Sequence, residues 1–219
     1  MAVLILFGFF VVIVVLGQQA VVRRRMRAVA AVAAAKGWAF SSGDTSNCAS
    51  APFHLFQRGR SRRASNVCSI AKGNVDVLRV FDYRFTEGSG KSSHTYQHSC
   101  ALFAEAARFP LLTIEHESLF AGVRDAVGLE DIQFESDEFN RTFRITSNDR
   151  KFAYAVIDPM MMQFLLDYPT SSMHISFHDR YVLLWCGRLA PTDIPSLANF
   201  ALALQSHIPT VAAELYPGD

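Results

Sequence analysis

The first segment of the chain is its longest apolar stretch. Residues 2–17 read AVLILFGFFVVIVVLG and contain no charged side chain. Continued through Val22 as a helix that rises ~1.5 Å per residue, the segment would be roughly 31 Å long, close to a hydrocarbon core of about 30 Å. A single span in lipid must satisfy its backbone groups internally, which a helix does. The pattern therefore predicts a transmembrane anchor over residues 1–22.

The arginines behind this stretch bear on its orientation. Arg23, Arg24, Arg25 and Arg27 follow it directly, and a Lys/Arg bias beside a span keeps that end in the cytoplasm. We therefore expect a single-pass protein of the cell membrane, with its N-terminus out and its C-terminal domain cytoplasmic. A cleaved secretory signal with a secreted or periplasmic body is the alternative, although nothing basic precedes the apolar stretch.

The next segment reads as a short stalk. The alanine-rich residues 28–36 favour a helix that ends at Gly37. We expect this helix to continue the membrane span as a basic, alanine-rich stalk over residues 23–37. A soluble α+β domain over residues 38–212 and a tail over residues 213–219 complete the predicted organisation.

Alternation of apolar and polar side chains predicts a sheet in the first half of the domain. Period-two alternation is the signature of a half-buried strand. Residues 94–104 and 111–115 read as further strands, and polar connections between strands favour an antiparallel meander. The strand over residues 75–85 is the clearest, since Val75, Val77, Phe81, Tyr83 and Phe85 alternate with Asp76, Asp82 and Arg84.

The second half predicts short strands and capped helices. Asp149 and Asp158 are expected to start helices, the second with Pro159 at its first position. Ser118 could likewise cap a short helix over residues 119–127. Residues 131–135, 143–146, 173–178 and 181–186 read as strands, the last two joined by a turn at Asp179-Arg180. One apolar face over residues 194–208 predicts a closing helix.

The expected fold class is therefore α+β. It comprises an N-terminal single transmembrane helix, a mainly antiparallel sheet with flanking helices, and a C-terminal amphipathic helix.

Composition excludes two classes of protein and reveals a charge split. Half of the 219 residues are apolar and 19% are charged, which excludes a disordered chain. The 4 cysteines are too few for a small disulfide-stapled scaffold. Eleven basic and two acidic residues lie in the first 80 positions, whereas ten basic and eighteen acidic residues follow. The basic part lies next to the predicted anchor.

A second basic cluster lies within the domain. Arg58, Arg60, Arg62 and Arg63 fall in residues 57–65, which lack apolar periodicity and read as an exposed loop. Anionic lipid headgroups attract such charges by ~1 kcal/mol each near the surface, so a lipid or partner contact and a merely solvated loop are the readings left open. Nucleic acid is not expected, because aromatic residues do not interleave with the arginines and the rest of the body is acidic.

Four short motifs recur in an order that resembles a known group. They are FDYRF at 81–85, FNRTFRI at 139–145, Asp149 followed by FAY at 152–154, and Asp158-Pro159-x-Met161. Together they resemble a group of uncharacterised bacterial proteins, common in actinobacteria, with an amino-terminal membrane segment and one cytosolic α+β domain of unknown function. The resemblance covers residues 20–190. It implies a membrane-tethered domain and carries over no catalytic residue.

The histidines and cysteines do not predict a metal site. His94, His98 and Cys100 are spaced H-x3-H-x-C, which would converge on one ion from a helix. On the strand that the pattern favours, four residues separate the two imidazoles by about 13 Å. His174 and His178 have the same spacing, so we expect no metal and no cofactor.

These observations leave two hypotheses about the function of the protein. No nucleophile elbow, zinc-protease or phosphate-loop motif is present in the sequence. The leading hypothesis is a binding or scaffolding module at the inner membrane face, with lipid and an unknown protein as partners. The alternative is a membrane-tethered enzyme with a site near Asp82, Asn140 and Arg141, where a buried acid beside an arginine could have a shifted pKa.

Overall fold

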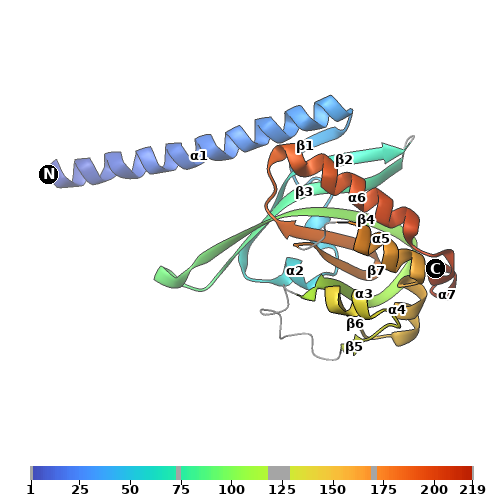
Figure 1. Cartoon of the computed structure of the whole chain (residues 1–219). Helices are drawn as coiled ribbons and strands as arrows, with labels where there is room; N and C mark the ends of the chain where they lie inside the picture. Colours follow the sequence, from blue (N-terminus) through green and yellow to red (C-terminus); the bar gives the residue numbers. More distant parts are fainter. Residues whose placement is uncertain (1, 73–74, 118–128, 169–171, 219) are drawn as a thin grey trace.

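A long helix and an antiparallel sheet form the structure, and the helix extends well beyond the sheet (Figure 1). The computed structural model describes residues 2–72, 75–117, 129–168 and 172–218. The strands are β1 (Ala39–Gly43), β2 (Arg60–Lys72), β3 (Val75–Glu87), β4 (His94–His116), β5 (Glu130–Ile132), β6 (Phe143–Ser147) and β7 (His174–Gly187). The helices are α1 (Ala2–Lys36), α2 (His54–Gln57), α3 (Asp137–Thr142), α4 (Arg150–Val156), α5 (Pro159–Asp167), α6 (Ile194–His207) and α7 (Thr210–Leu215).

Strand β4 is the central strand of the sheet and pairs with β3, β6 and β7. Its first part, His94–Leu102, pairs with β3, its last part, Leu112–His116, pairs with β6, and β7 pairs with it from His98 to Glu115. β3 and β6 therefore share one edge of β4 while β7 occupies the other. All of these pairings are antiparallel, and the strand order is β1-β2-β3-β4-β6-β5 with β7 beside β4. The α+β class with an antiparallel sheet is what the structure shows.

The two faces of the sheet are covered differently. We call the face that carries Val80, Asp82, Ala101 and Leu184 the helix face. Its apolar side chains pack with those of α1 and α6 in the larger core, and Asp82 bonds to α1. The opposite α2 face carries Phe81, Tyr83, Cys100 and Leu183, and it packs against Phe53, Leu55 and Phe56 of the segment around α2. Alternate residues of β3 and β4 thus serve two cores, as a strand covered on both sides requires.

The C-terminal part of α1 packs against the domain. Val29 and Ala33, one turn apart, are fully buried against the helix face. Gly37 ends the helix with φ +70°, and the backbone N–H of Trp38 donates to Ala33 O at 2.8 Å, as in a Schellman motif. The predicted end of this helix at Gly37 is therefore confirmed. Figure 1 shows the N-terminal part of α1 extending away from the sheet.

The prediction of a transmembrane helix is wrong. Within the residues that the structure describes, no helix is both long and apolar enough to cross a membrane. The expected continuation of this helix into the segment 23–37 is present, since α1 runs unbroken from Ala2 to Lys36. The transmembrane part of the expected fold class, and the description as a single-pass membrane protein, are corrected accordingly.

Three segments that read as breaks are parts of longer strands. Residues 60–65, expected in a basic loop, are the first part of β2, and Arg63 pairs directly with Arg84 of β3. The expected turn at Asp179-Arg180 lies within β7, where Asp179 has φ +52°. The strands expected at 94–104 and 111–115 form one strand, β4, with irregular pairing between Ala104 and Leu112. β4 and β7 pair with each other on both sides of their irregular positions, so each continues as one strand.

The predicted caps are confirmed for two helices. The Asp149 side chain accepts a hydrogen bond from Phe152 N of α4, and Asp158 accepts one from Met161 N of α5, where Pro159 is the first residue. Each cap satisfies an N–H group that the first turn leaves unpaired. The helix expected after Ser118 lies outside the described residues.

One buried hydroxyl on the α2 face lacks a hydrogen bond. Tyr83 is 1% exposed, and its Oη has no hydrogen-bond partner among the residues that the structure describes. Its ring packs edge-on against Phe56, with the ring centroids 4.8 Å apart. Burial raises the pKa of Tyr83 to about 12, so the group is a neutral phenol at physiological pH. A buried donor without a partner costs about 1–3 kcal/mol.

Replacing Tyr83 by phenylalanine should therefore not destabilise the protein. We expect the free energy of unfolding of Tyr83→Phe, measured by urea denaturation, to equal that of the wild type or to exceed it by up to about 2 kcal/mol. Tyr216→Phe is the matched control, because the Tyr216 hydroxyl donates to Asp149 Oδ2 at 2.6 Å and its removal should be destabilising. A loss of more than about 1 kcal/mol in Tyr83→Phe would show that the hydroxyl is bonded in solution.

The cap of α4 makes a pH-dependent contribution to stability. Hydrogen bonds from Tyr216 and from the backbone of Phe152 hold the pKa of Asp149 below its ordinary value of 3.8. A carboxylate with a lowered pKa in the folded state stabilises the protein above its unfolded pKa, and this stabilisation is lost as the pH falls through the folded pKa.

We expect Asp149→Ala to lower the free energy of unfolding by about 1 kcal/mol at pH 7. The difference from the wild type should shrink when unfolding is measured below about pH 4, because the unfolded state then binds a proton while the folded Asp149 is still ionised, and it should vanish below the folded pKa. A difference that stays constant from pH 7 to pH 3 would contradict the assigned shift.

Candidate functional site

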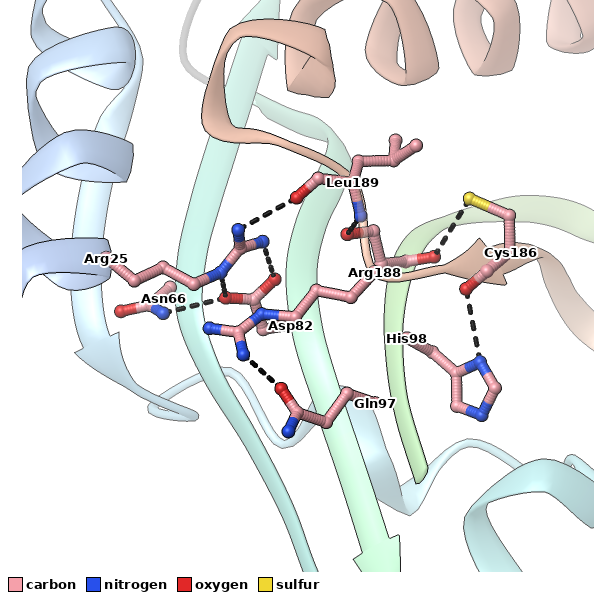
Figure 2. Close-up of polar contacts among 9 residues, drawn as sticks. Arg25, Asn66, Asp82, Gln97, His98, Cys186, Arg188 and Leu189 are labelled. Atoms are coloured by element: carbon pink, nitrogen blue, oxygen red, sulfur yellow. Dashed lines mark hydrogen bonds and ion pairs between the residues drawn. The ribbon is translucent and has the colours of Figure 1, made fainter. Parts of the chain in front are cut away.

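A bidentate ion pair joins α1 to the middle of the sheet. Arg25 donates from Nε to Asp82 Oδ2 at 2.7 Å and from Nη2 to Asp82 Oδ1 at 2.6 Å. Its third nitrogen, Nη1, donates to Leu189 O at 2.8 Å. Each of the two charged side chains is 11% exposed. We call this interaction the Arg25–Asp82 junction, and Figure 2 shows its geometry.

A bulge in β2 supplies a third group to the junction. The register of β2 against β3 shifts between Ser65 and Cys68, and Asn66 within this shift has φ +52°. This left-handed conformation is one that asparagine tolerates better than most residues. The bulge places Asn66 Nδ2 2.8 Å from Asp82 Oδ2. Both oxygens of the buried carboxylate are therefore hydrogen-bonded, as burial of a charge requires.

The segment after β7 closes the junction from the other side. Leu189 N donates to Ser99 Oγ at 3.1 Å, which holds the carbonyl of Leu189 beside Arg25. Arg188 donates to Gln97 Oε1, and Figure 2 shows its side chain running next to Asp82. Partial burial, followed by the charge of Arg25, lowers the pKa of Arg188, while Asp82 opposes this shift. Two guanidinium groups thus lie beside one carboxylate.

The residues of the enzyme hypothesis do not form one site. Asp82 is bonded to Arg25 and Asn66. Asn140 instead holds the chain ahead of α3, since it accepts from Phe134 N at 2.9 Å and donates to Phe134 O at 2.7 Å. Arg141 is exposed in the last turn of α3. The structure therefore gives Asp82 and Asn140 separate structural partners.

The four arginines expected to contact lipid are arranged at one end of β2, and three of them bond to the protein itself. Arg58 forms an ion pair with Glu87 at 3.0 Å, and Arg60 donates to Gly88 O. Arg62 donates to Gln57 O at 2.9 Å. These three side chains link the start of β2 to neighbouring segments. Arg63 is exposed on the helix face, opposite Arg84, and a lipid contact by the four stays a prediction.

Three histidines, His98, His174 and His178, make separate polar contacts on the α2 face. His98 Nδ1 lies 3.1 Å from Cys186 O, and burial lowers the pKa of this imidazole. His174 lies 3.0 Å from Glu115 Oε1 and stacks on Trp185, with centroids 3.8 Å apart. His178 Nδ1 lies 2.8 Å from Pro52 O. Among the described residues, no three His, Cys, Asp or Glu side chains are grouped as ligands for one metal ion.

Sequence reasoning found Asp82 but missed its partners. An aspartate between aromatic residues of a strand was a visible signal of a buried charge. Arg25 was interpreted as one of several charges beside a membrane, although Arg25, Val29 and Ala33 follow the four-residue spacing of a helix face that packs. Asn66 and Arg188 had no distinguishing local pattern.

These features define an α+β domain in which a long helix is fixed to an antiparallel sheet by a buried ion pair. No known family profile matches the sequence, and no curated protein is significantly similar to it. Among solved structures, the fold is similar to that of the mycobacterial trehalose monomycolate transport factor A, TtfA, with a TM-score of 0.57 and 10% sequence identity. The similarity covers 85% of this chain and 91% of that chain. At this identity the likeness concerns the fold.

The Arg25–Asp82 junction should be strongly coupled. Removing one partner leaves a buried charge uncompensated, so Arg25→Met or Asp82→Leu alone should each cost about 3–5 kcal/mol of unfolding free energy. The double variant should cost less than the sum of the two losses, with a coupling energy of about 1–3 kcal/mol in urea denaturation.

The exposed pair Arg108–Asp179 is the matched control for this cycle. Its side chains are 52% and 36% exposed, so its coupling should stay below about 1 kcal/mol. Additive losses at Arg25 and Asp82 would show that the two side chains do not stabilise one another.

Proposed function

We propose that this protein is a non-catalytic binding or scaffolding module that presents the N-terminal part of α1 to a partner protein. The observation that carries the proposal is the Arg25–Asp82 junction, which fixes α1 to the sheet and leaves the preceding residues to extend from the domain. We call residues 2–24 the arm. A buried bidentate ion pair gives such an element a defined direction.

The surface of the arm supports a protein partner. Leu16, Val21 and Val22 are 59%, 65% and 60% exposed, although apolar side chains of this size are normally covered. Arg23 and Arg24 are exposed next to them. A surface that complements this arrangement would be apolar and bordered by acidic side chains, because opposite charges favour association and orient it.

The fold similarity is compatible with an accessory role. TtfA is described as a transport factor for trehalose monomycolate, and we propose an accessory role of that general kind for this chain, without extending the cargo to it. The expected position in the cytoplasm beside an anionic lipid surface stays a prediction. We do not propose the enzyme hypothesis, because Asp82 is bonded to Arg25 and Asn66 while Asn140 is bonded to Phe134.

Photo-crosslinking from the arm tests the proposal. A photoreactive residue at Val22 in the full chain should give one discrete adduct with another protein in intact cells. The same residue at Tyr154, which is 47% exposed on α4, is the matched control and should give no such adduct. Replacing Arg23 and Arg24 by glutamate should reduce the Val22 adduct several-fold, since charge complementarity would be reversed.

Three outcomes would contradict the proposal. They are the absence of an adduct at Val22, an equal adduct at Tyr154, and an adduct that mass spectrometry identifies as a second copy of this chain.

A further inference from the structure

A row of arginines crosses the helix face next to the Arg25–Asp82 junction. Arg63 of β2 pairs with Arg84 of β3, and Arg84 pairs with Gln97 of β4. The next position across the sheet is Arg188, which follows the His98–Gly187 pair and donates to Gln97. Arg84 lies two residues from Asp82 and so on the same face. We call Arg63, Arg84, Gln97 and Arg188 the cationic row.

The like charges of the cationic row repel one another when no anion is bound. Directly opposed residues of antiparallel strands have Cβ atoms about 5 Å apart, and like charges at such positions destabilise the pair. Arg63 and Arg84 form such a pair. Among the described residues, neither forms a hydrogen bond or an ion pair with an acidic side chain, and the partner of Arg188 is the neutral Gln97.

The carboxylate of Asp82, which lies beside Arg188, is already hydrogen-bonded. Asp82 accepts hydrogen bonds from Arg25 at both oxygens and from Asn66 at one. The junction and the row together hold four guanidinium groups, those of Arg25, Arg63, Arg84 and Arg188, against this one carboxylate. A local excess of positive charge therefore remains at one end of the helix face.

The spacing suits an anion bound above Gln97. Neighbouring strands lie ~4.8 Å apart, so Arg84 and Arg188 are separated by about 10 Å across β4, with Gln97 between them. Long side chains at these positions can turn toward a common group, and the Gln97 amide can donate to it as well. Guanidinium groups bind phosphate with two parallel hydrogen bonds, which makes arginine the preferred residue for planar recognition of this group.

We propose that Arg63, Arg84 and Arg188 bind a phosphate group on the helix face, with Gln97 as a neutral donor between them. The inference goes beyond the proposed function, because it concerns the sheet and holds whether or not the arm binds a protein. It also differs from the lipid contact expected at Arg58, Arg60, Arg62 and Arg63, of which only Arg63 belongs to the row. The phosphate can come from a soluble compound or from a lipid headgroup.

Calorimetric titration of the full chain with inorganic phosphate and with pyrophosphate tests the site, with ionic strength held constant by chloride. We expect saturable binding by the wild type and a loss of affinity of about tenfold or more in Arg84→Gln, as for removal of a charge-assisted pair. Arg180→Gln is the charge-matched control. Arg180 is exposed in the middle of β7, eight residues before Arg188, and its loss should change affinity less than about twofold.

Thermal unfolding of the same variants separates binding from folding. At low salt and without phosphate, Arg84→Gln should unfold at the wild-type temperature or above it, because the repulsion with Arg63 is removed. The rise in unfolding temperature that phosphate produces in the wild type should be lost. A variant that keeps its stability but loses this response cannot have lost binding through misfolding.

Vesicles distinguish the two sources of the phosphate. Full chain is mixed with phosphatidylcholine vesicles with or without phosphatidic acid. Extra retention on phosphatidic acid that Arg84→Gln lacks and Arg180→Gln keeps assigns the site to a headgroup. Phosphate or pyrophosphate binding without this extra retention assigns it to a soluble compound. Equal affinity of Arg84→Gln and Arg180→Gln, or no binding by the wild type in either assay, would overturn the inference.

Discussion

Burial of one carboxylate in the middle of a sheet constrains much of this structure. Asp82 can be buried only with partners at both oxygens, and those partners come from distant parts of the chain: Arg25 of α1 and Asn66 of the β2 bulge. The left-handed residue in β2, the docking of α1 and the path of the chain after β7 are all coupled to this charge. Removing it would affect the direction of α1 as well as local stability.

Local patterns predicted the elements better than their assembly. The alternation in β3, the caps at Asp149 and Asp158 and the end of α1 at Gly37 depend on a few neighbouring residues, and each is present in the structure. The continuity of β4 and β7 depends on pairing between strands far apart in sequence, which overrides local breaks such as Asp179. Periodicity within one segment carries no information about that pairing.

Local sequence patterns were likewise insufficient to predict the partners in the candidate site. Asp82 was recognisable because a charge among apolar strand residues needs a partner, but Arg25 lies 57 positions away and was interpreted through its neighbours instead. The apolar start of the chain led to a transmembrane prediction that the described helices do not support. The arginines of the cationic row come from three separate segments, and only the register of the sheet brings them together.

The cysteines have a practical consequence. All 4 are buried, and burial raises the pKa of each thiol, to about 12 for Cys48 and about 11 for Cys68 and Cys186. Because the thiolate is the reactive form, the native side chains should be poor targets for maleimide reagents. A single cysteine engineered on the surface would then accept a dye or spin label selectively. Pairs of such labels could report the angle between α1 and the sheet in a background that keeps every natural thiol.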